Sequence, residues 1–334
     1  MTVPISGSPQ ASLATNIELH LLEYVDTGRI YDVLRPELYY NEFFPAGSMS
    51  ANVPPGALDF TRFLKDWAGK AAFRAAGSND VSLVTQGFSK VSTPIFHGAI
   101  AHVMDSKDAE RQTIINRQVP GLALGEDIGN TLMRAVEYHK ELLYFFGDFA
   151  PDGSQNFYYP GILNNPEIPV ATVSTNAAGT STKWVDKTPD ETSQDITDAI
   201  TTMTEASDTL FTVTDIYLPV SQLGLIASTK AGLLANDQTI WKFTSTQNLT
   251  TAISDDGRVI NFHMMRYLKG AGVGGTDRMM VVNRKPEYFM MCQPVDFKIK
   301  SVREEDFAIK TLAEYELSPV FLPYPTMINF HDGI

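Results

Sequence analysis

The sequence predicts an α+β protein in which helices and strands intermix without regular βαβ units. Two observations lead to this prediction. Residues 46–103 are rich in strand-forming residues broken by turn signals, and residues 125–146 have the pattern of one long amphipathic helix. No internal repeat or low-complexity linker marks independent domains. With 334 residues, the chain is long enough for two core-bearing lobes or one elongated domain.

Residues 1–45 are predicted to form an arm. Pro4, Gly7 and Pro9 keep its start irregular, and the stretch up to Phe44 alternates short apolar groups with charges. Such a segment buries little surface by itself. We therefore expect it to gain order by lying on a neighbour.

Residues 46–103 are predicted to form a long antiparallel ribbon. Its first half has large apolar residues recurring through a polar background, namely Leu58, Phe60, Phe63 and Trp67. Its second half, 81–101, is rich in β-branched residues, Ser and Thr, and the tip is expected between Gly69 and Asp80. A ribbon this isolated is only marginally stable, so we expect it to lie on another surface.

A helix broken into two pieces follows the ribbon. The first piece begins near Asp108 and is interrupted at Pro120, because proline removes a helical donor. The second piece, Gly125 to Phe146, spans roughly 33 Å, and Gly147 is its expected stop. One apolar stripe is predicted along it, formed by Ile128, Leu132, Ala135, Leu142, Leu143 and Phe146.

The second half of the chain mixes shorter elements. A capping signature at Thr188 to Glu191 starts a helix whose buried face would be Ile196, Ile200 and Met203. Further helices are predicted from Pro219 and over 237–245. Strands are predicted at 210–218, 259–267, 278–283 and 288–292, and an extended tail at 317–330.

Composition limits the possible partners. Hydrophobic residues make up 43% and charged residues 19%, as in a folded chain. The net charge of −13 argues against sequence-specific binding of nucleic acid, which needs a basic footprint. The single cysteine, Cys292, lies in an apolar run and is expected to be an inert buried thiol.

Targeting signals are not evident. The N-terminal residues lack the basic start and apolar run of a signal peptide. No apolar stretch approaches the ~20 residues that span a bilayer. The sequence therefore predicts a protein made and used in a reducing cytoplasm, with no membrane contact.

The glycine run 270–275 matches the GxGxxG pattern of dinucleotide-binding proteins. That pattern works only where the glycine turn opens a helix. Here residues 277–282 resemble a strand, so a loop is the better interpretation and nucleotide binding the minor one.

Other candidate chemistry is equally weak. The histidines lack the spacing of a zinc helix, and His139 is expected to be a packed side chain rather than a ligand. The acidic residues between Asp186 and Asp208 are expected to form a solvated face rather than a cation site. Asp148 and Asp152 carry too few oxygens for a calcium loop. We predict no catalytic, cofactor-binding or metal residues, no cofactor, and a protein that is not an enzyme.

The order of the parts resembles a known family. An arm and a ribbon precede a long helix ending in Phe145-Phe146-Gly147-Asp148, and Gly161-Ile162-Leu163-Asn164-Asn165 follows. Trp184, a capped helix and Gly274-Gly275-Thr276-Asp277-Arg278 before a strand complete the series. This order resembles the major capsid proteins of tailed bacteriophages, whose shell fold is the Hong Kong 97 type. The resemblance covers nearly the whole chain from about residue 30.

The resemblance implies a domain organisation. Residues 1–45 would be the N-terminal arm and 46–103 an extended loop lying over an adjacent subunit. Residues 104–150 and 276–334 would form a peripheral domain with the spine helix, and 151–275 an axial domain around five-fold and six-fold axes.

The resemblance also implies partners. The chain would assemble with itself, as pentamers and hexamers, into an icosahedral shell that encloses the double-stranded DNA of a phage without reading its sequence. A portal, a separate scaffolding protein and possibly a cement or decoration protein would join it. Assembly would take place in the cytoplasm of the bacterial host. Nothing in the sequence identifies a crosslinking lysine and asparagine.

Two rival interpretations remain open. The same fold builds encapsulin-type compartments around a protein cargo, and a shell copurifying with one enzyme would favour that function. A cytoplasmic enzyme could also assemble its site from residues far apart in the sequence, and a monomer with a bound metal or nucleotide would favour that one. A tail-tube or decoration protein is a third possibility, but such proteins usually lack a spine helix of this length.

Overall fold

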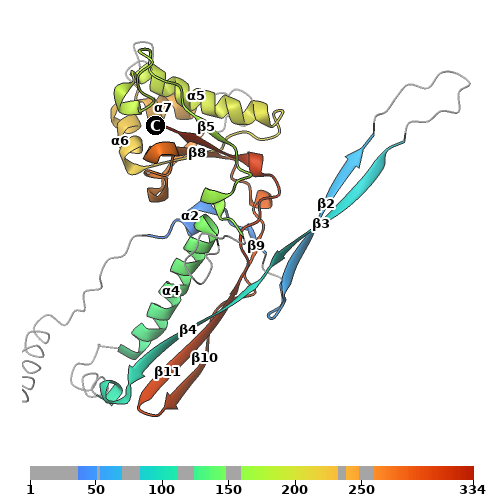
Figure 1. Cartoon of the computed structure of the whole chain (residues 1–334), viewed down its shortest axis with the longest axis vertical. Coiled ribbons are helices and arrows are strands. Elements are labelled where there is room, and N and C mark those ends of the chain that lie inside the picture. Colours follow the sequence, from blue (N-terminus) through green and yellow to red (C-terminus); the bar gives the residue numbers. More distant parts are fainter. Residues whose placement is uncertain are drawn as a thin grey trace, which may run out of the picture. The chain divides into compact units, whose positions relative to one another are not determined.

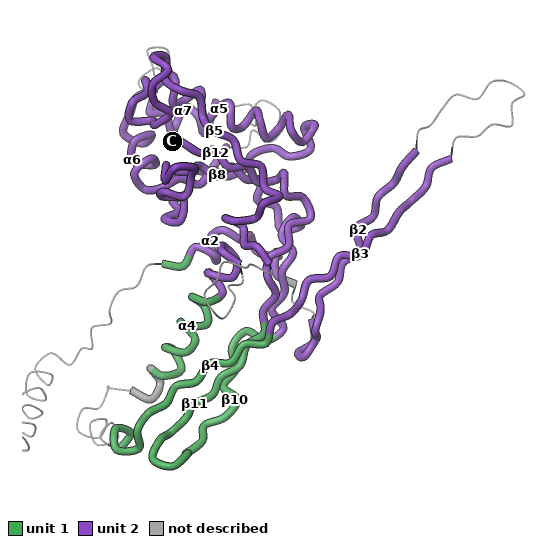
Figure 2. Tube along the Cα trace, viewed as in Figure 1, with its two compact units in different colours: residues 1–38, 97–139, 295–316 green, residues 39–96, 140–294, 317–334 purple. Residues whose placement is uncertain are grey.

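A computed structural model gives the structure of the chain (Figure 1), and it describes residues 37–50, 53–69, 83–110, 124–147, 159–231, 238–247 and 259–334. The described chain is divided between two compact units (Figure 2). The first unit includes residues 97–139 and 295–316, and the second includes 39–96, 140–294 and 317–334. The predicted arm up to residue 36 and residues 111–123 of the first helical piece lie outside the described residues.

The second unit is built on a five-stranded mixed sheet with the order β5-β12-β8-β6-β7. Its strands are β5 (Val170–Thr172), β6 (Asp215–Leu218), β7 (Asn261–Met264), β8 (Arg278–Val282) and β12 (Ile328–Asp332). β12 pairs parallel to β5 and antiparallel to β8, and β6 pairs antiparallel to β8 and parallel to β7. β6 and β12 are buried along their whole length, as expected for central strands covered on both faces.

Three helices accompany this sheet: α5 (Pro189–Ala206), α6 (Val220–Ser228) and α7 (Ile240–Thr246). α5 contacts β8 and β12, and α6 and α7 contact β7. Thr188 caps α5 by accepting a bond from the backbone of Glu191, whose carboxylate bonds back to Thr188. Ile196, Ile200 and Met203 are buried, so the predicted capping box and apolar face of this helix are confirmed.

The first unit contains a three-stranded sheet with the order β10-β11-β4. The strands are β4 (Phe96–Asp105), β10 (Val295–Glu305) and β11 (Ala308–Leu317). Gly98 and Tyr315 make a close contact in this sheet, because a Cβ built on Gly98 would lie 2.1 Å from the phenol ring of Tyr315. A side chain at Gly98 would displace the ring, which fixes glycine at this position.

The long helix α4 (Leu124–Phe146) confirms the predicted spine, and Gly147 follows it with φ of +83°. Its buried side chains are Leu132, Val136, Lys140, Glu141, Leu143, Tyr144 and Phe145. Leu132 and Leu143 were predicted to be buried, whereas Ile128, Ala135, Leu142 and Phe146 are only half-buried. The buried stripe is therefore rotated from the predicted one. The buried stripe includes two charged side chains, Lys140 and Glu141.

The predicted ribbon is an antiparallel hairpin of β2 (Asp59–Ala68) and β3 (Thr85–Pro94), paired over all ten positions of each strand. Its tip, 70–82, lies outside the described residues. The stretch 81–101 was predicted as one strand, but it contains β3 and the start of β4, separated at Ile95. Ile95 is buried and its N–H donates to the Leu58 carbonyl, so the chain leaves the ribbon there.

Several other strand predictions need correction. The strand expected at 210–218 is only β6, 259–267 is β7 followed by a 3-10 turn, and 288–292 contains only β9 (Met291–Cys292). β9 pairs with β1 (Met49–Ser50). The β10–β11 hairpin was not predicted, and the tail expected to be extended ends in the central strand β12.

Candidate assembly surfaces and the clusters that anchor them

The β2–β3 ribbon has one strongly exposed apolar face. Residues directly opposite in an antiparallel pair share a face, and Phe63 is opposite Lys90 while Lys65 is opposite Phe88. Trp67, two residues beyond Lys65, projects to the same side. Phe63, Trp67 and Phe88 are 71%, 67% and 68% exposed. We call these five residues the aromatic–lysine face.

The opposite face of the ribbon is better covered. Phe60, Leu64 and Val91 are half-buried there, and the Arg62 guanidinium lies 5.2 Å from the centre of the Phe60 ring. The two faces therefore differ in how much apolar surface they leave in water. Exposed apolar surface of this kind is typical of an interaction site.

A second exposed feature lies at the turn of the β10–β11 hairpin. Glu304, Glu305, Asp306 and Phe307 are all exposed, and Phe307 is 80% exposed. Asp306 has φ of +53°, a conformation that aspartate tolerates in tight turns. The N–H of Ser106 donates to the Phe307 carbonyl at 2.7 Å. We call these four turn residues the acidic tip.

The C-terminal end of α4 is locked onto the loop that follows it. A Cβ built on Gly161 would lie 2.4 Å from backbone atoms of Phe145, Phe146 and Gly147. The Asn164 amide donates to the Phe146 carbonyl at 2.6 Å and its side-chain oxygen accepts from the Gly161 N–H at 2.8 Å. Asn164 thus supplies the hydrogen bond that the last carbonyl of the helix would otherwise lack. This contact explains the role of the Gly-Ile-Leu-Asn segment in the fold.

Glu141 joins α4 to two other segments. Its buried carboxylate accepts bonds from the Tyr267 hydroxyl, from Arg266 at 3.0 Å and from the Tyr39 N–H at 2.8 Å. Burial, and then the bond to Glu141, raise the pKa of Tyr267 to about 12. The phenol therefore stays protonated and keeps donating. This cluster anchors the chain at Tyr39.

His263 is held between two carboxylates. Its Nδ1 lies 2.9 Å from Glu42 of α2 (Tyr40–Phe43), and its Nε2 lies 2.8 Å from Asp215. Burial opposes the charge, but the bonds to Asp215 and Glu42 dominate and raise the pKa of His263. Arg284 donates to the Glu42 carbonyl at 2.9 Å and to the Tyr217 hydroxyl at 3.0 Å. Both clusters are structural, because each joins residues 39–42 to other segments of the second unit.

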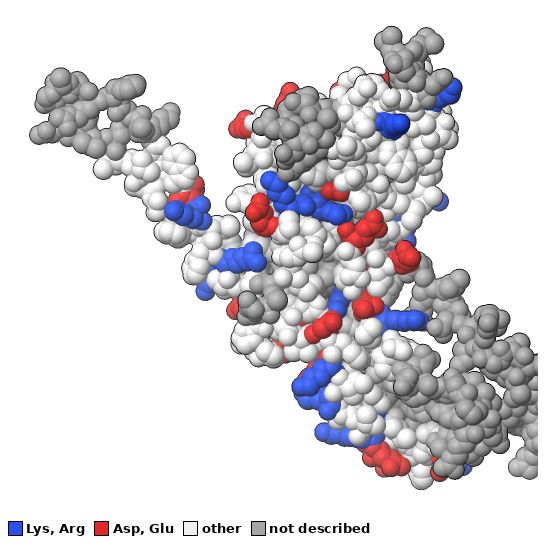
Figure 3. All heavy atoms as spheres, turned by 180° about the vertical axis from the view of Figure 1, so that it is seen from behind, with Lys and Arg blue, Asp and Glu red and all other residues white. Residues whose placement is uncertain are grey.

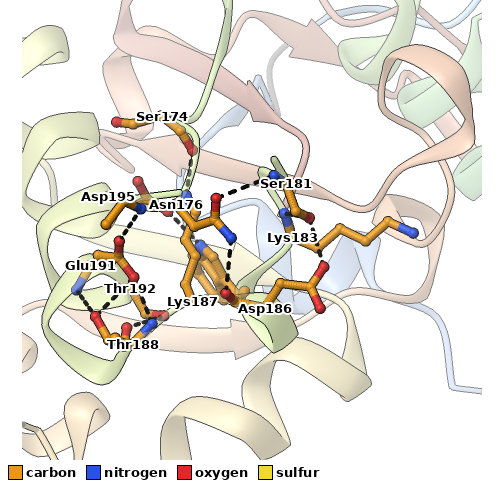
Figure 4. Close-up of polar contacts among 12 residues, drawn as sticks. Ser174, Asn176, Ser181, Lys183, Asp186, Lys187, Thr188, Glu191, Thr192 and Asp195 are labelled. Carbon is orange, nitrogen blue, oxygen red and sulfur yellow. Dashed lines mark hydrogen bonds and ion pairs between the residues drawn. The ribbon is translucent and has the colours of Figure 1, made fainter. Parts of the chain in front are cut away.

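A buried ion pair anchors the segment before α5 (Figure 4). Lys187 donates to the Asp195 carboxylate and, at 2.5 Å, to the Ser174 carbonyl, and Trp184 donates to Asp195 at 2.9 Å. Burial raises the pKa of Asp195 although both neighbours donate to it. The acidic run predicted to be solvated is therefore divided: Asp190, Asp198 and Glu205 are exposed, but Asp195 is a buried structural acid.

The rest of this segment is tied by short polar contacts (Figure 4). Asn176 accepts from the backbone of Thr180 and Ser181, and its amide donates to the Asp186 carbonyl at 3.3 Å. Ser181 donates to the Asp186 carboxylate at 2.7 Å. These bonds fold residues 174–188 into a defined loop rather than an open connector.

The glycine run 270–275 is a loop followed by strand β8, as predicted, and does not open a helix. The N–H of Val273 donates to Asp332 at 3.1 Å, and Arg278 binds the same carboxylate through two nitrogens at 2.6 and 2.9 Å. A backbone N–H of the loop is therefore bound by the Asp332 side chain of strand β12, which Arg278 of β8 holds in place.

The other residues considered from the sequence are a cysteine, a histidine and two aspartates. Cys292 is a free buried thiol, as predicted, and burial raises its pKa. His139 is exposed rather than packed, with its ring 5.9 Å from that of Tyr315. Asp148 and Asp152 lie outside the described residues.

Two features are absent from the residues that the structure describes. No group of three or more His, Cys, Asp or Glu side chains could hold a metal ion there. None of the helices in the described ranges has the length and apolar character needed to cross a bilayer.

Charge is spread in small groups on the face seen in Figure 3, where basic and acidic side chains stand among uncharged surface and basic groups stand along the ribbon. The paired strands of the ribbon contain the cations Arg62, Lys65 and Lys90 and the anions Asp59 and Asp66. The whole chain has a net charge of −13. The ribbon thus differs in charge from the rest of the chain.

Comparison with known proteins gives one matching family and several similar solved structures. The family described as "Major capsid protein" matches residues 69–334, and no curated protein sequence matches the chain. Among solved structures, the capsid of Myoviridae phage XM1 is similar with a TM-score of 0.69 at 15% identity, over 92% of this chain and 96% of that one. A Gordonia phage Cozz structure is similar with a TM-score of 0.57 at 12% identity, over 92% and 89%. The capsid of an empty GTA particle gives 0.55 at 10% identity, over 91% and 92%.

Proposed function

This chain belongs to the major capsid protein family, and from that membership we propose how its parts build a shell. It is a capsid shell protein with the Hong Kong 97-type fold of phage capsid subunits, and its place is in the virion capsid. It assembles with itself. We assign it a structural role without catalysis, in an icosahedral shell around double-stranded phage DNA.

The proposed parts follow the elements. Residues 1–45 act as the arm that reaches a neighbour, and the ribbon within 46–103 lies over an adjacent subunit. Residues 104–150, with α4, and the part of 276–334 outside β8 and β12 supply the peripheral part. Residues 151–275 supply the axial part, together with β8 and β12, since these strands share its sheet.

The single observation that supports this division is the exposed aromatic–lysine face. Three large aromatic side chains, more than two-thirds exposed in a two-stranded ribbon, leave apolar surface that a partner would cover. Rings of five and six subunits closed by such contacts would form a shell. Many modest contacts summed over each subunit would resist the pressure of packaged DNA.

The wider partners belong to the same proposal. Assembly takes place in the host cytoplasm, with a portal, a separate scaffolding protein and possibly a cement protein. DNA is enclosed without sequence-specific contact, which fits the net charge of −13. A protein cargo in place of DNA would instead mark an encapsulin-type compartment.

Shortening the ribbon tests this function. Thr61 and Ser92 are opposite each other, so residues 62–91 can be replaced by an Asn-Gly turn without changing the register. We expect a soluble subunit that keeps its thermal unfolding transition but forms no closed shells in sedimentation and electron microscopy. Normal shells from the shortened chain would contradict the proposal.

A further inference from the structure

We propose that the aromatic–lysine face of the ribbon in one copy of this chain binds the acidic tip of the β10–β11 hairpin in a second copy. This proposal rests on the proposed shell function, since it names which surfaces meet when subunits assemble. It adds the face of the ribbon, the receiving element and the chemistry of the contact.

Apolar complementarity is the first argument. The ribbon face offers three exposed aromatic side chains, and the acidic tip offers Phe307, whose side chain is 80% exposed. Aromatic rings prefer edge-to-face or offset contact with other rings. Covering these rings removes apolar surface from water on both partners.

Charge complementarity is the second argument. Lys65 and Lys90 are both exposed on the aromatic–lysine face. Glu304, Glu305 and Asp306 are three consecutive exposed carboxylates at the tip. Lysines set among rings that become covered would meet carboxylates in a partly dry contact, where attraction is stronger than in water. Such pairing also fixes the register of two surfaces.

Another acidic surface of the described chain, on helix α5, fits less well. Helix α5 exposes Asp190, Asp198 and Glu205 at helical spacing, but the positions between them along that stripe are Gln194 and Thr202. That stripe offers no apolar partner for the aromatic rings. The acidic tip combines both kinds of group, so the tip of a second copy is the occupant.

A matched pair of variants tests which face binds. Lys65→Gln with Lys90→Gln and Thr85→Glu with Ser89→Glu change the net charge equally, and Thr85 and Ser89 are exposed on the opposite face. We expect the lysine variant to lose closed shells and the opposite-face variant to keep them, with the thermal unfolding of both subunits unchanged. Loss of shells only in the opposite-face variant would overturn the proposal.

Charge exchange tests the receiving element. Lys65→Glu with Lys90→Glu should abolish closed shells, and so should Glu304→Lys with Glu305→Lys. Combining all four changes in one chain should restore them, because the two new carboxylates on the ribbon then meet the two new lysines at the tip. Failure of the combined variant to restore shells, with its subunit still folded, would overturn the acidic tip as the partner.

Crosslinking separates a contact between copies from a contact within one chain. Shells assembled from mixed normal and isotope-labelled wild-type subunits would be treated with a carbodiimide, which joins lysine amines to carboxylates. We expect Lys65 or Lys90 linked to Glu304, Glu305 or Asp306 in peptides of mixed label. Links found only within one label would overturn the proposal. Closed shells of the wild-type chain would still support the proposed shell function in that case. The contact between ribbon and tip can therefore be refuted without refuting the shell function.

Discussion

Gly161 shows how one residue fixes the end of the spine helix. Backbone atoms of 145–147 occupy the space where its side chain would begin, and the C-terminal carbonyl of Phe146 depends on Asn164 in the same turn. A methyl group at Gly161 must push two backbone segments apart. The sequence shows a glycine here without showing what lies against it.

We therefore expect Gly161→Ala to destabilise the subunit by about 1–3 kcal/mol or more, the usual cost of overpacking. Gly129→Ala is the control, because nothing lies within 4 Å of its Cβ position on α4. That control should be neutral or stabilising by up to about 1 kcal/mol, since alanine favours helices. Thermal unfolding of both variants measures the difference, and equal stability would contradict the proposed lock.

His331 makes the stability of the subunit depend on pH. It is buried on the central strand β12, and burial lowers its pKa from 6.5 to about 4 although Asp332 and Asp198 favour its charge. The unfolded chain then binds more protons between these two values. The contribution of His331 to stability is full above pH 6.5 and is lost as pH falls toward 4.

Replacing His331 by Leu should therefore flatten the fall in stability between pH 6.5 and 4. The difference is on the order of 3 kcal/mol over the whole window. Denaturant unfolding at several pH values gives the slopes. An unchanged slope in His331→Leu would show that this imidazole is not buried in its neutral form.

At the scale of elements, α4 was predictable and its buried face was only partly so. Length, stop signal and position of the helix follow from the 3.6-residue period and Gly147. The rotation of its stripe does not, because Lys140 and Glu141 are both buried. Glu141 is paired there with two residues of another segment, Arg266 and Tyr267. Local periodicity assigns charged residues to the outside and cannot anticipate such pairing.

The stripe can be tested at neighbouring positions. Leu132 is 4% exposed and Met133 is 41% exposed. Leu132→Asp buries an unpaired charge and should cost about 4 kcal/mol or more, enough to prevent folding. Met133→Asp should change subunit stability by less than about 1 kcal/mol. Circular dichroism and thermal unfolding compare them, and a stable Leu132→Asp subunit would place the stripe elsewhere.

The strands show why the sheets were harder to predict than the helices. The ribbon was predicted from β-branched and aromatic residues, but its end at Ile95 depends on a backbone bond to Leu58. The β10–β11 hairpin was not predicted, although Val295 to Lys300 alternate apolar and charged side chains as a strand does. The charged run 303–306 that follows breaks this alternation before the turn. β12 was hidden by the prolines before it, although it is a fully buried inner strand of its sheet.

At the scale of the whole molecule, the sequence shows no recognisable catalytic or binding site. The function was therefore predicted from the order of the arm, the ribbon and the long helix. Four buried polar clusters, centred on Glu141, His263, Asp195 and Asp332, stabilise the fold rather than perform chemistry. Exposed large apolar groups occur in many parts of the described chain, and the aromatic side chains of the ribbon and Phe307 are among the most exposed of them. The aromatic–lysine face and the acidic tip are the contact surfaces that we propose, in keeping with membership of a capsid family.

Electron microscopy of the purified, full-length protein tests the central claim most directly. A shell subunit should form closed, regular particles in which each copy contacts several neighbours, with the density of a two-stranded ribbon lying on an adjacent copy. Protein that stays monomeric under all assembly conditions, or particles in which each ribbon lies only on its own chain, would contradict the account.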